Sequence, residues 1–258
     1  MAASLVACTT STTSQQRSAA SEQPTTTTQE AGSEDVQRRA RVRLELAAGY
    51  FSRGKLDVAL EETRNALRAD PNFAPAYNLL GLVYMNLNER TQAEEAFQRA
   101  LQLAPNDSES HNNYGWFLCQ TGRVSESFAQ FNAALRNPLY ETPAVAQRNA
   151  GICALRANDT AAAVEYLQKA FQSEPSNAAT QYNLALALYQ RGEFDRARFY
   201  IGRLNRQIEP TPETLWLELR VERKLGDRDA AASIGSQLRR RFPESREAQA
   251  LQRGAFDE

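Results

Sequence analysis

Apolar and small residues recur in this chain at intervals of 34 residues. The clearest copy lies at 74–107, where they follow one another in steps of three and four on both sides of a short polar stretch. Its members are Tyr77, Leu80, Gly81, Tyr84, Ala93, Phe97, Ala100 and Pro105. Such steps place side chains on one face of an α-helix, so each copy predicts two amphipathic helices joined by a turn.

The same positions are filled in the neighbouring copies. A shift toward the N-terminus reaches Leu46, Tyr50, Gly54, Ala59, Ala66 and Pro71, and a shift toward the C-terminus reaches His111, Tyr114, Gly115, Gly122, Phe131 and Ala134. After a two-residue insertion near 137–140, the series continues with Gly151, Ala163, Leu167, Leu184, Ala185, Leu188, Gly226, Ala231 and Leu238. We predict six copies, at about 40–73, 74–107, 108–143, 144–177, 178–211 and 212–245.

These residue types in this order resemble the tetratricopeptide repeat (TPR). The resemblance implies an all-α fold, namely a right-handed α-solenoid of six TPR helix-turn-helix repeats closed by a short C-terminal capping helix at 245–251. A single helix pair cannot bury its apolar face, so the pairs must stack and the last one needs a cap. An ordinary helical bundle is the competing structure, but it does not require a fixed 34-residue register.

Small residues explain how the two helices of a repeat come together. Gly81 and Ala93 occupy the eighth and twentieth positions of their repeat, where larger side chains would hold the helices apart. A second set falls at the turn between the helices, where a left-handed backbone favours glycine. This set consists of Gly54, Gly122, Gly192 and Gly226.

The N-terminus predicts a lipid anchor. The sequence Leu5-Val6-Ala7-Cys8 fits the bacterial lipobox, in which the cysteine thiol accepts diacylglycerol, although a chance match in a disordered tail is the alternative. Only seven residues precede Cys8 and none is basic, so we expect 1–8 to be the remnant of a longer signal peptide. Thr9, rather than Asp, follows the cysteine, which in the lipoprotein sorting rule implies the periplasmic face of the outer membrane.

A linker is predicted between this anchor and the repeats. Residues 9–34 are rich in Ser, Thr, Gln and Ala and include four consecutive threonines. Such a segment buries too little apolar surface to offset the entropy of ordering it, so we expect disorder. The repeats then fill 35–258 as one solenoid domain.

Composition and charge exclude several classes of function. Lys and Arg number 30 against 31 Asp and Glu, so no basic field is available for nucleic acid. The one histidine, His111, falls where the repeat holds a packing residue, and no metal-binding or nucleophile motif occurs. We therefore expect no enzyme, no cofactor, no metal site and no small-molecule substrate. An enzyme that uses His111 with Glu and Tyr side chains is the remaining alternative.

Two cysteines fall on the first helices of adjacent repeats. Cys119 and Cys153 are spaced so that an oxidising periplasm would allow a disulfide between them. We expect two small buried thiols in preference to a bridge, and the sequence leaves the choice open.

An apolar row is predicted along the concave surface of the solenoid. In TPR proteins this surface is lined by positions 2, 5, 9, 12 and 13 of each first helix. The predicted groove residues are Leu44, Phe51, Asn78, Leu82, Met85, Asn112, Trp116, Ile152, Leu155, Tyr182, Leu186 and Tyr189. Each of them can instead pack against the next repeat, but so long a row favours a groove for an extended or helical peptide, with Asn78 and Asn112 bonding its backbone. The Lys/Asn clamp of co-chaperone repeats is absent, since Leu44 and Ala48 stand there.

Three stretches are more specific than the repeat. HNNYGWFLC at 111–119, NPLY at 137–140 and NAGICAL at 149–155 resemble the type IV pilus biogenesis and stability lipoproteins of the PilW/PilF type. The resemblance implies a pilotin, an outer-membrane lipoprotein that binds subunits of the pilus secretin, promotes their localisation and multimerisation, and so supports twitching motility. A general envelope TPR lipoprotein that docks peptidoglycan enzymes or outer-membrane assembly factors is the alternative.

Overall fold

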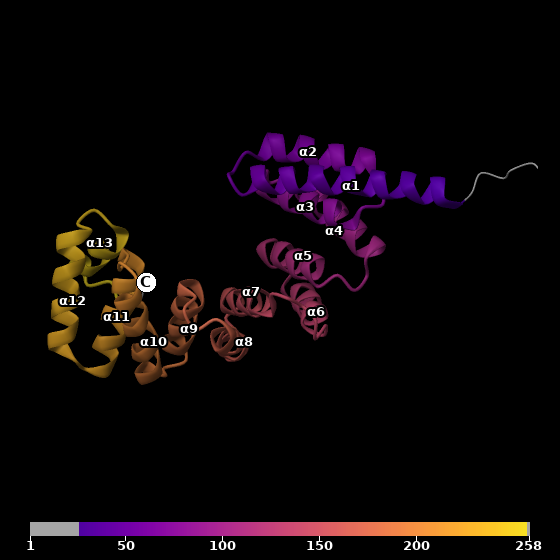
Figure 1. The fold of residues 1–258 in the computed structure, drawn as a ribbon. Helices are drawn as coiled ribbons and strands as arrows, with labels where there is room; N and C mark the ends of the chain where they lie inside the picture. The colour runs from indigo at the N-terminus through magenta and orange to yellow at the C-terminus, as the bar shows by residue number, and fades with distance from the viewer. Residues whose placement is uncertain (1–25, 257–258) are drawn as a thin grey trace, which may run out of the picture.

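The structure, a computed structural model, describes residues 26–256, which form thirteen helices and no strand. The helices are α1 (Thr26–Phe51), α2 (Leu56–Ala69), α3 (Ala74–Asn86), α4 (Arg90–Leu103), α5 (Ser108–Gln120), α6 (Val124–Leu135), α7 (Pro143–Arg156), α8 (Thr160–Ser173), α9 (Ala178–Gln190), α10 (Phe194–Gln207), α11 (Pro212–Leu225), α12 (Arg228–Arg241) and α13 (Arg246–Arg253). They form a curved stack (Figure 1).

The first twelve helices form six antiparallel pairs, which we call repeats 1 to 6, and α13 packs on α11 and α12 as the cap. The predicted α-solenoid of six TPR helix pairs with a C-terminal cap is confirmed. Ser245 begins the cap because its side chain accepts a hydrogen bond from the Ala248 backbone N–H at 3.1 Å.

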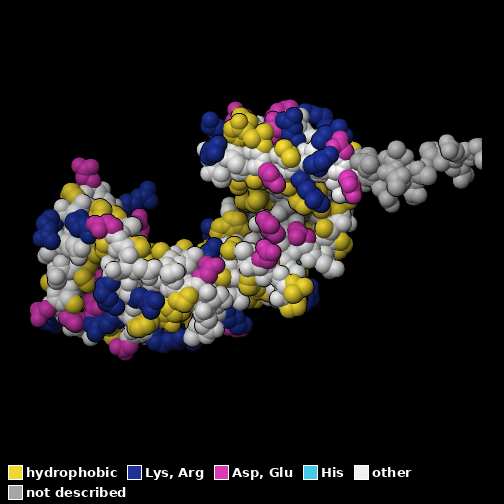
Figure 2. All heavy atoms as spheres, viewed as in Figure 1, with side chains coloured by type: hydrophobic (Ala, Val, Ile, Leu, Met, Phe, Trp, Pro, Cys, Tyr) yellow, Lys and Arg dark blue, Asp and Glu magenta, His cyan; other side chains and the backbone are white. Residues whose placement is uncertain are grey.

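The two helices of each repeat play different parts in the curvature. Successive odd-numbered helices lie with their backbones close together from α1 to α11, whereas the even-numbered helices of the described residues meet only through long side chains, such as Tyr166 of α8 bonding Asn132 of α6. In a bent stack, the layer whose backbones lie closer together is the inner one. The odd-numbered helices therefore line the concave side, and Figure 2 shows the hollow that this bend leaves between the N-terminal and C-terminal repeats.

Helix α1 begins earlier than the sequence indicated. It starts at Thr26, so residues 26–34, which we predicted as part of a disordered linker, belong to a helix. The packed part of α1 already provides the helix nucleus, so each residue added at its N-terminal end gains a backbone hydrogen bond at little further cost in conformational entropy. Directly after this extension, Asp35 forms ion pairs with Arg38 and Arg39 on the same helix. The rest of the predicted linker and the lipobox lie outside the described residues.

The predicted glycine turns are confirmed. Gly54, Gly122, Gly192 and Gly226 have φ values of 70°, 84°, 78° and 80°. In repeats 2 and 4 the equivalent residues are Asn88 and Asn158, with φ of 61° and 59°. Asparagine is the residue type that tolerates this conformation best after glycine, so all six turns have the same backbone shape.

The close approach of the two helices depends on the glycine at the eighth position. A Cβ atom built on Gly81 would lie 2.6 Å from Cε1 of Phe97, and one on Gly115 would lie 2.9 Å from Cδ1 of Phe131. Both rings are fully buried. The aromatic side chain of the second helix thus occupies the space that any larger residue on the first would need.

We expect Gly81→Ala to lower the free energy of unfolding by about 1–3 kcal/mol, because the Phe97 ring must move out of its packed position. Gly49→Ala is the matched control, since nothing lies within 4 Å of a Cβ at that helical glycine. It should stabilise the protein by about 0.5–1 kcal/mol through helix propensity. Urea denaturation of both variants checks the pair, and equal effects would contradict the close-packing argument.

Candidate functional site: the concave groove

All twelve predicted groove residues lie on odd-numbered helices, which form the inner layer. Helix α1 carries Leu44 and Phe51; α3 carries Asn78, Leu82 and Met85; α5 carries Asn112 and Trp116; α7 carries Ile152 and Leu155; α9 carries Tyr182, Leu186 and Tyr189. The structure therefore brings together on one layer residues that are separated by up to four repeats. Their role as a binding surface stays a prediction.

Burial divides these twelve residues into two groups. Asn78, Asn112, Leu155 and Tyr189 are less than a tenth exposed and belong to the contacts between repeats. The other eight, namely Leu44, Phe51, Leu82, Met85, Trp116, Ile152, Tyr182 and Leu186, are half-buried. Apolar side chains that remain partly open can gain further burial from a partner, so this second group is the part of the predicted groove that still has apolar surface to offer.

The two asparagines that we predicted to bond a peptide backbone, Asn78 and Asn112, are buried and pair with neighbouring amides. Asn113 donates to the Asn78 side-chain oxygen at 3.2 Å, Asn149 donates to that of Asn112 at 3.0 Å, and Asn112 donates to that of Asn113 at 3.3 Å. This amide ladder links α3, α5 and α7. A buried amide must find a hydrogen-bond partner, and here the partners come from the adjacent repeats. The ladder fixes the stacking of repeats 2 to 4.

Arginines from the next inner helix cover the aromatic groove residues. The guanidinium carbon of Arg156 lies 5.0 Å from the centre of the Trp116 ring, and that of Arg220 lies 4.6 Å from the centre of the Tyr189 ring. Both distances lie within the range of cation–π attraction. Positive charge therefore lies over two of the aromatic rings of this layer, those of Trp116 and Tyr189.

Repeat 6 continues the groove with residues that we did not predict. The same helix positions, carried one repeat further along α11, hold Trp216, Arg220 and Arg223. The 34-residue register does assign these three residues to groove positions. We missed them because we looked for a row of apolar side chains, and two of the three are charged.

A disulfide joins Cys119 of α5 to Cys153 of α7. Our expectation of two separate buried thiols was wrong. The two positions lie on adjacent inner helices, and their Cα atoms are 5.8 Å apart, which is within the usual range for a disulfide. The bridge ties repeat 3 to repeat 4 directly beside Trp116, which packs against the same apolar cluster.

The polar side chains that could have served as catalytic groups form hydrogen bonds with neighbouring helices and loops. His111 Nε2 lies 2.9 Å from the Pro105 carbonyl oxygen, and Nδ1 lies 2.6 Å from the Gln130 side-chain oxygen, so the ring joins α5 to α6 and to the preceding loop. Glu94 accepts hydrogen bonds from Tyr114 at 2.9 Å and from Arg123 at 2.5 Å. These contacts hold neighbouring helices together.

Burial and charge set the ionisation of groups along this layer. Burial raises the pKa of the Tyr182 hydroxyl, and the neighbouring Glu213 carboxylate acts in the same direction, so this groove side chain stays neutral at physiological pH. Burial also raises the pKa of the Glu218 carboxyl on α11.

Within residues 26–256, no helix is both long enough and apolar enough to cross a bilayer. Likewise, this part of the chain has no group of three His, Cys, Asp or Glu side chains arranged to hold a metal ion.

Sequence models of the tetratricopeptide repeat match residues 49–88, 74–107, 96–129 and 154–217. The helix pairs and the inner groove thus define a TPR solenoid.

Two proteins of pilus assembly are similar over most of the chain. The type IV pilus assembly protein PilF of Pseudomonas aeruginosa is 31% identical over 209 residues, which is 81% of this chain and 83% of PilF. A crystal structure of PilW, described as a widely conserved type IV pilus biogenesis factor, superposes with a TM-score of 0.77 at 30% identity and covers 83% of this chain and 98% of PilW. A structure of P. aeruginosa PilF gives the same TM-score at 29% identity, over 85% of this chain and 99% of that one. The chain belongs to the family of type IV pilus biogenesis TPR proteins of the PilF/PilW type.

Proposed function

We propose that this chain is a pilotin, a lipoprotein scaffold that binds subunits of the type IV pilus secretin and promotes their localisation and multimerisation. The observation that carries the proposal is the similarity to PilF and PilW, which extends over more than four-fifths of the chain and is not confined to one repeat. The half-buried apolar surface of α1 to α9 supplies a place for a secretin segment.

Membrane attachment gives the scaffold its mechanism. We propose that Cys8 carries the acyl chains and holds the protein on the periplasmic face of the outer membrane, as the Leu5-Val6-Ala7-Cys8 sequence favours. A scaffold confined to the membrane where the secretin must insert raises the local concentration of captured subunits, so their assembly into a ring is favoured. Binding and release suffice for this role, so we propose that the protein is not an enzyme.

In a strain that lacks the gene, we expect Trp116→Asp to fail where the wild-type chain restores secretin multimers and twitching. A carboxylate at this half-buried groove position adds a charge that a bound apolar segment would have to desolvate. Secretin recovered with the purified variant should fall about tenfold or more, the size of a binding hot spot. Phe51→Asp and Tyr182→Asp examine repeats 1 and 5 in the same way, and both side chains are half-buried.

Phe199→Asp is the matched control, because Phe199 lies on the outer helix α10 and is 55% exposed. It should leave secretin capture unchanged. If all three groove variants stay folded and still capture the secretin, the concave surface is not the binding site. Altered cell shape with normal secretin multimers in the deletion strain would instead favour a general envelope scaffold.

A further inference from the structure

Residues 254–256, which we call the tail, fold back onto the concave surface of repeat 6. Helix α13 stops at Gly254, whose left-handed backbone (φ 71°) allows the Gly254 N–H to bond the Leu251 carbonyl at 3.2 Å and the Ala255 N–H to bond the Ala250 carbonyl at 3.0 Å. Hydrogen bonds of this kind reverse the chain at the end of a helix. Residues 254–256 consequently turn back toward α11, where Ala255 and Phe256 are partly buried.

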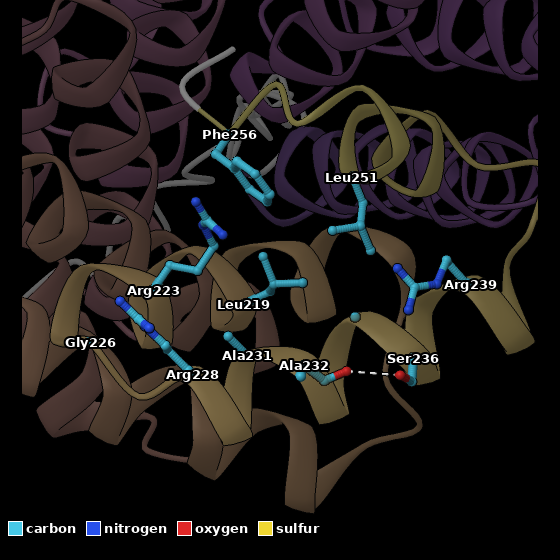
Figure 3. Close-up of a pocket in the computed structure, with 11 residues that line it drawn as sticks. Leu219, Arg223, Gly226, Arg228, Ala231, Ala232, Ser236, Arg239, Leu251 and Phe256 are labelled. Atoms are coloured by element: carbon cyan, nitrogen blue, oxygen red, sulfur yellow. Dashed lines mark hydrogen bonds between the residues drawn. The ribbon is translucent and has the colours of Figure 1, made fainter.

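Phe256 is held there by two side chains of repeat 6. Its ring stacks on Trp216 with the centroids 5.6 Å apart and the planes 19° apart, and the Arg223 guanidinium lies 3.5 Å from the centre of the Phe256 ring. Figure 3 shows Phe256 beside Arg223, with Leu219 of α11 and Leu251 of α13 close by. We call Trp216 and Arg223 the aromatic clamp. Both stand at the positions that make the groove in repeats 1 to 5, so the tail occupies the groove of the last repeat.

Two cavities adjoin the clamp, and Phe256 and Arg223 line both. One, of about 360 Å³, opens between Tyr189, Arg220 and the tail, and the other, of about 500 Å³, lies between α11, α12 and α13. Arg228 and Arg239 line the second cavity, and no acidic side chain of the described residues lines either. The buried Nε of Arg220 has no hydrogen-bond partner among these residues. The space around the clamp is therefore suited to carboxylates that accompany an aromatic ring.

In the sequence, the aromatic residue of the tail, Phe256, is followed by two acidic residues, Asp257 and Glu258. We propose that the aromatic clamp is a binding site for a partner-protein segment in which an aromatic side chain is followed by acidic residues. The tail of this chain occupies the clamp through Phe256 until such a segment displaces it. This site is distinct from the apolar surface of α1 to α9 and does not depend on the partner being a secretin.

Competition with the tail gives a direct test. The probe is a fluorescent peptide, Gly-Ala-Phe-Asp-Glu, which copies residues 254–258, and its binding is followed by anisotropy. An attached tail acts at an effective concentration on the order of millimolar. We therefore expect the peptide to bind a chain ending at Arg253 at least about tenfold more tightly than the full chain. Phe256→Ala in the full chain should open the site in the same way without shortening α13, and circular dichroism establishes that both proteins are folded.

Two controls distinguish specific binding at the clamp from non-specific binding of the peptide. Adding Arg223→Ala to the shortened chain should abolish binding, and so should replacing the Phe of the peptide by Ala. Equal affinity for the full and shortened chains, or binding to neither, would overturn the proposal. So would a full chain that dimerises in analytical ultracentrifugation while Phe256→Ala is monomeric, because the occupant would then be the tail of a second copy.

Discussion

Phe97→Ala should destabilise the protein by about 3–5 kcal/mol, the largest effect that we expect from a single side chain. Phe97 is fully buried, its ring centre lies 5.8 Å from that of Tyr114 and 5.7 Å from that of Phe117, and its edge fills the space above Gly81. Removing the ring leaves a cavity that glycine cannot fill. Because these neighbours belong to two repeats, the loss weakens the packing within repeat 2 and its contact with repeat 3.

The position of this loss also predicts how the variant unfolds. In a solenoid each repeat contacts only its neighbours, so a weak junction allows one end to open before the other. Circular dichroism in urea should show the transition at lower denaturant and with a shallower slope. Phe199→Ala removes the same atoms from a side chain that is 55% exposed, and it should cost no more than about 0.5 kcal/mol. Similar shifts for the two variants would mean that Phe97 is not a packing centre.

The repeat made most of the fold predictable. Two steric requirements recur every 34 residues: a glycine or alanine at the eighth position of the repeat, and a glycine at the turn. Gly81 meets the first and Gly122 meets the second, as expected. Asn88 and Asn158 show that the backbone conformation is what recurs, since a different residue adopts it where glycine is missing. A periodic sequence predicts the shared geometry of its repeats.

The contacts between particular repeats were not predictable in this way. The amide ladder that includes Asn112 and Asn149, and the disulfide of Cys153, depend on the angle at which one repeat is placed on the next. Position within the repeat shows which helices are neighbours, but not which atoms meet. The position of the tail was even less predictable, since Phe256 lies outside the repeats and no periodic pattern relates it to Trp216.

The same reasoning explains the partial success at the groove. Leu82, Trp116 and Tyr182 were assigned from their positions alone, and the structure places them on the inner layer with part of their surface open. Tyr189 has the corresponding position but is buried, because Arg220 and Phe194 pack on its ring. A shared position predicts a shared layer, whereas exposure depends on the size of the neighbours.

The disulfide leads to the second large effect. The bridge closes a loop whose ends are 34 residues apart, so it restricts the unfolded chain by about 3–4 kcal/mol in the chain-entropy account. It also clips together the inner helices of repeats 3 and 4 at the centre of the stack, where opening would divide the solenoid into two halves. Its loss should thus affect the junction between the halves as well as overall stability.

We expect a Cys119→Ala, Cys153→Ala double variant to lose about 3 kcal/mol of unfolding free energy in urea, and the wild-type chain to lose a similar amount when reductant is added. Alanine is the apt replacement because both positions are buried. Reductant should not affect the double variant further, and Cys8→Ala, which removes the cysteine outside the bridge, should unfold as the wild type does and stay sensitive to reductant. A wild-type chain with the same midpoint in oxidising and reducing buffer would show that the bridge does not stabilise this junction, and the apolar cluster of Phe131 with Ala150 would then have to hold repeats 3 and 4 together without it.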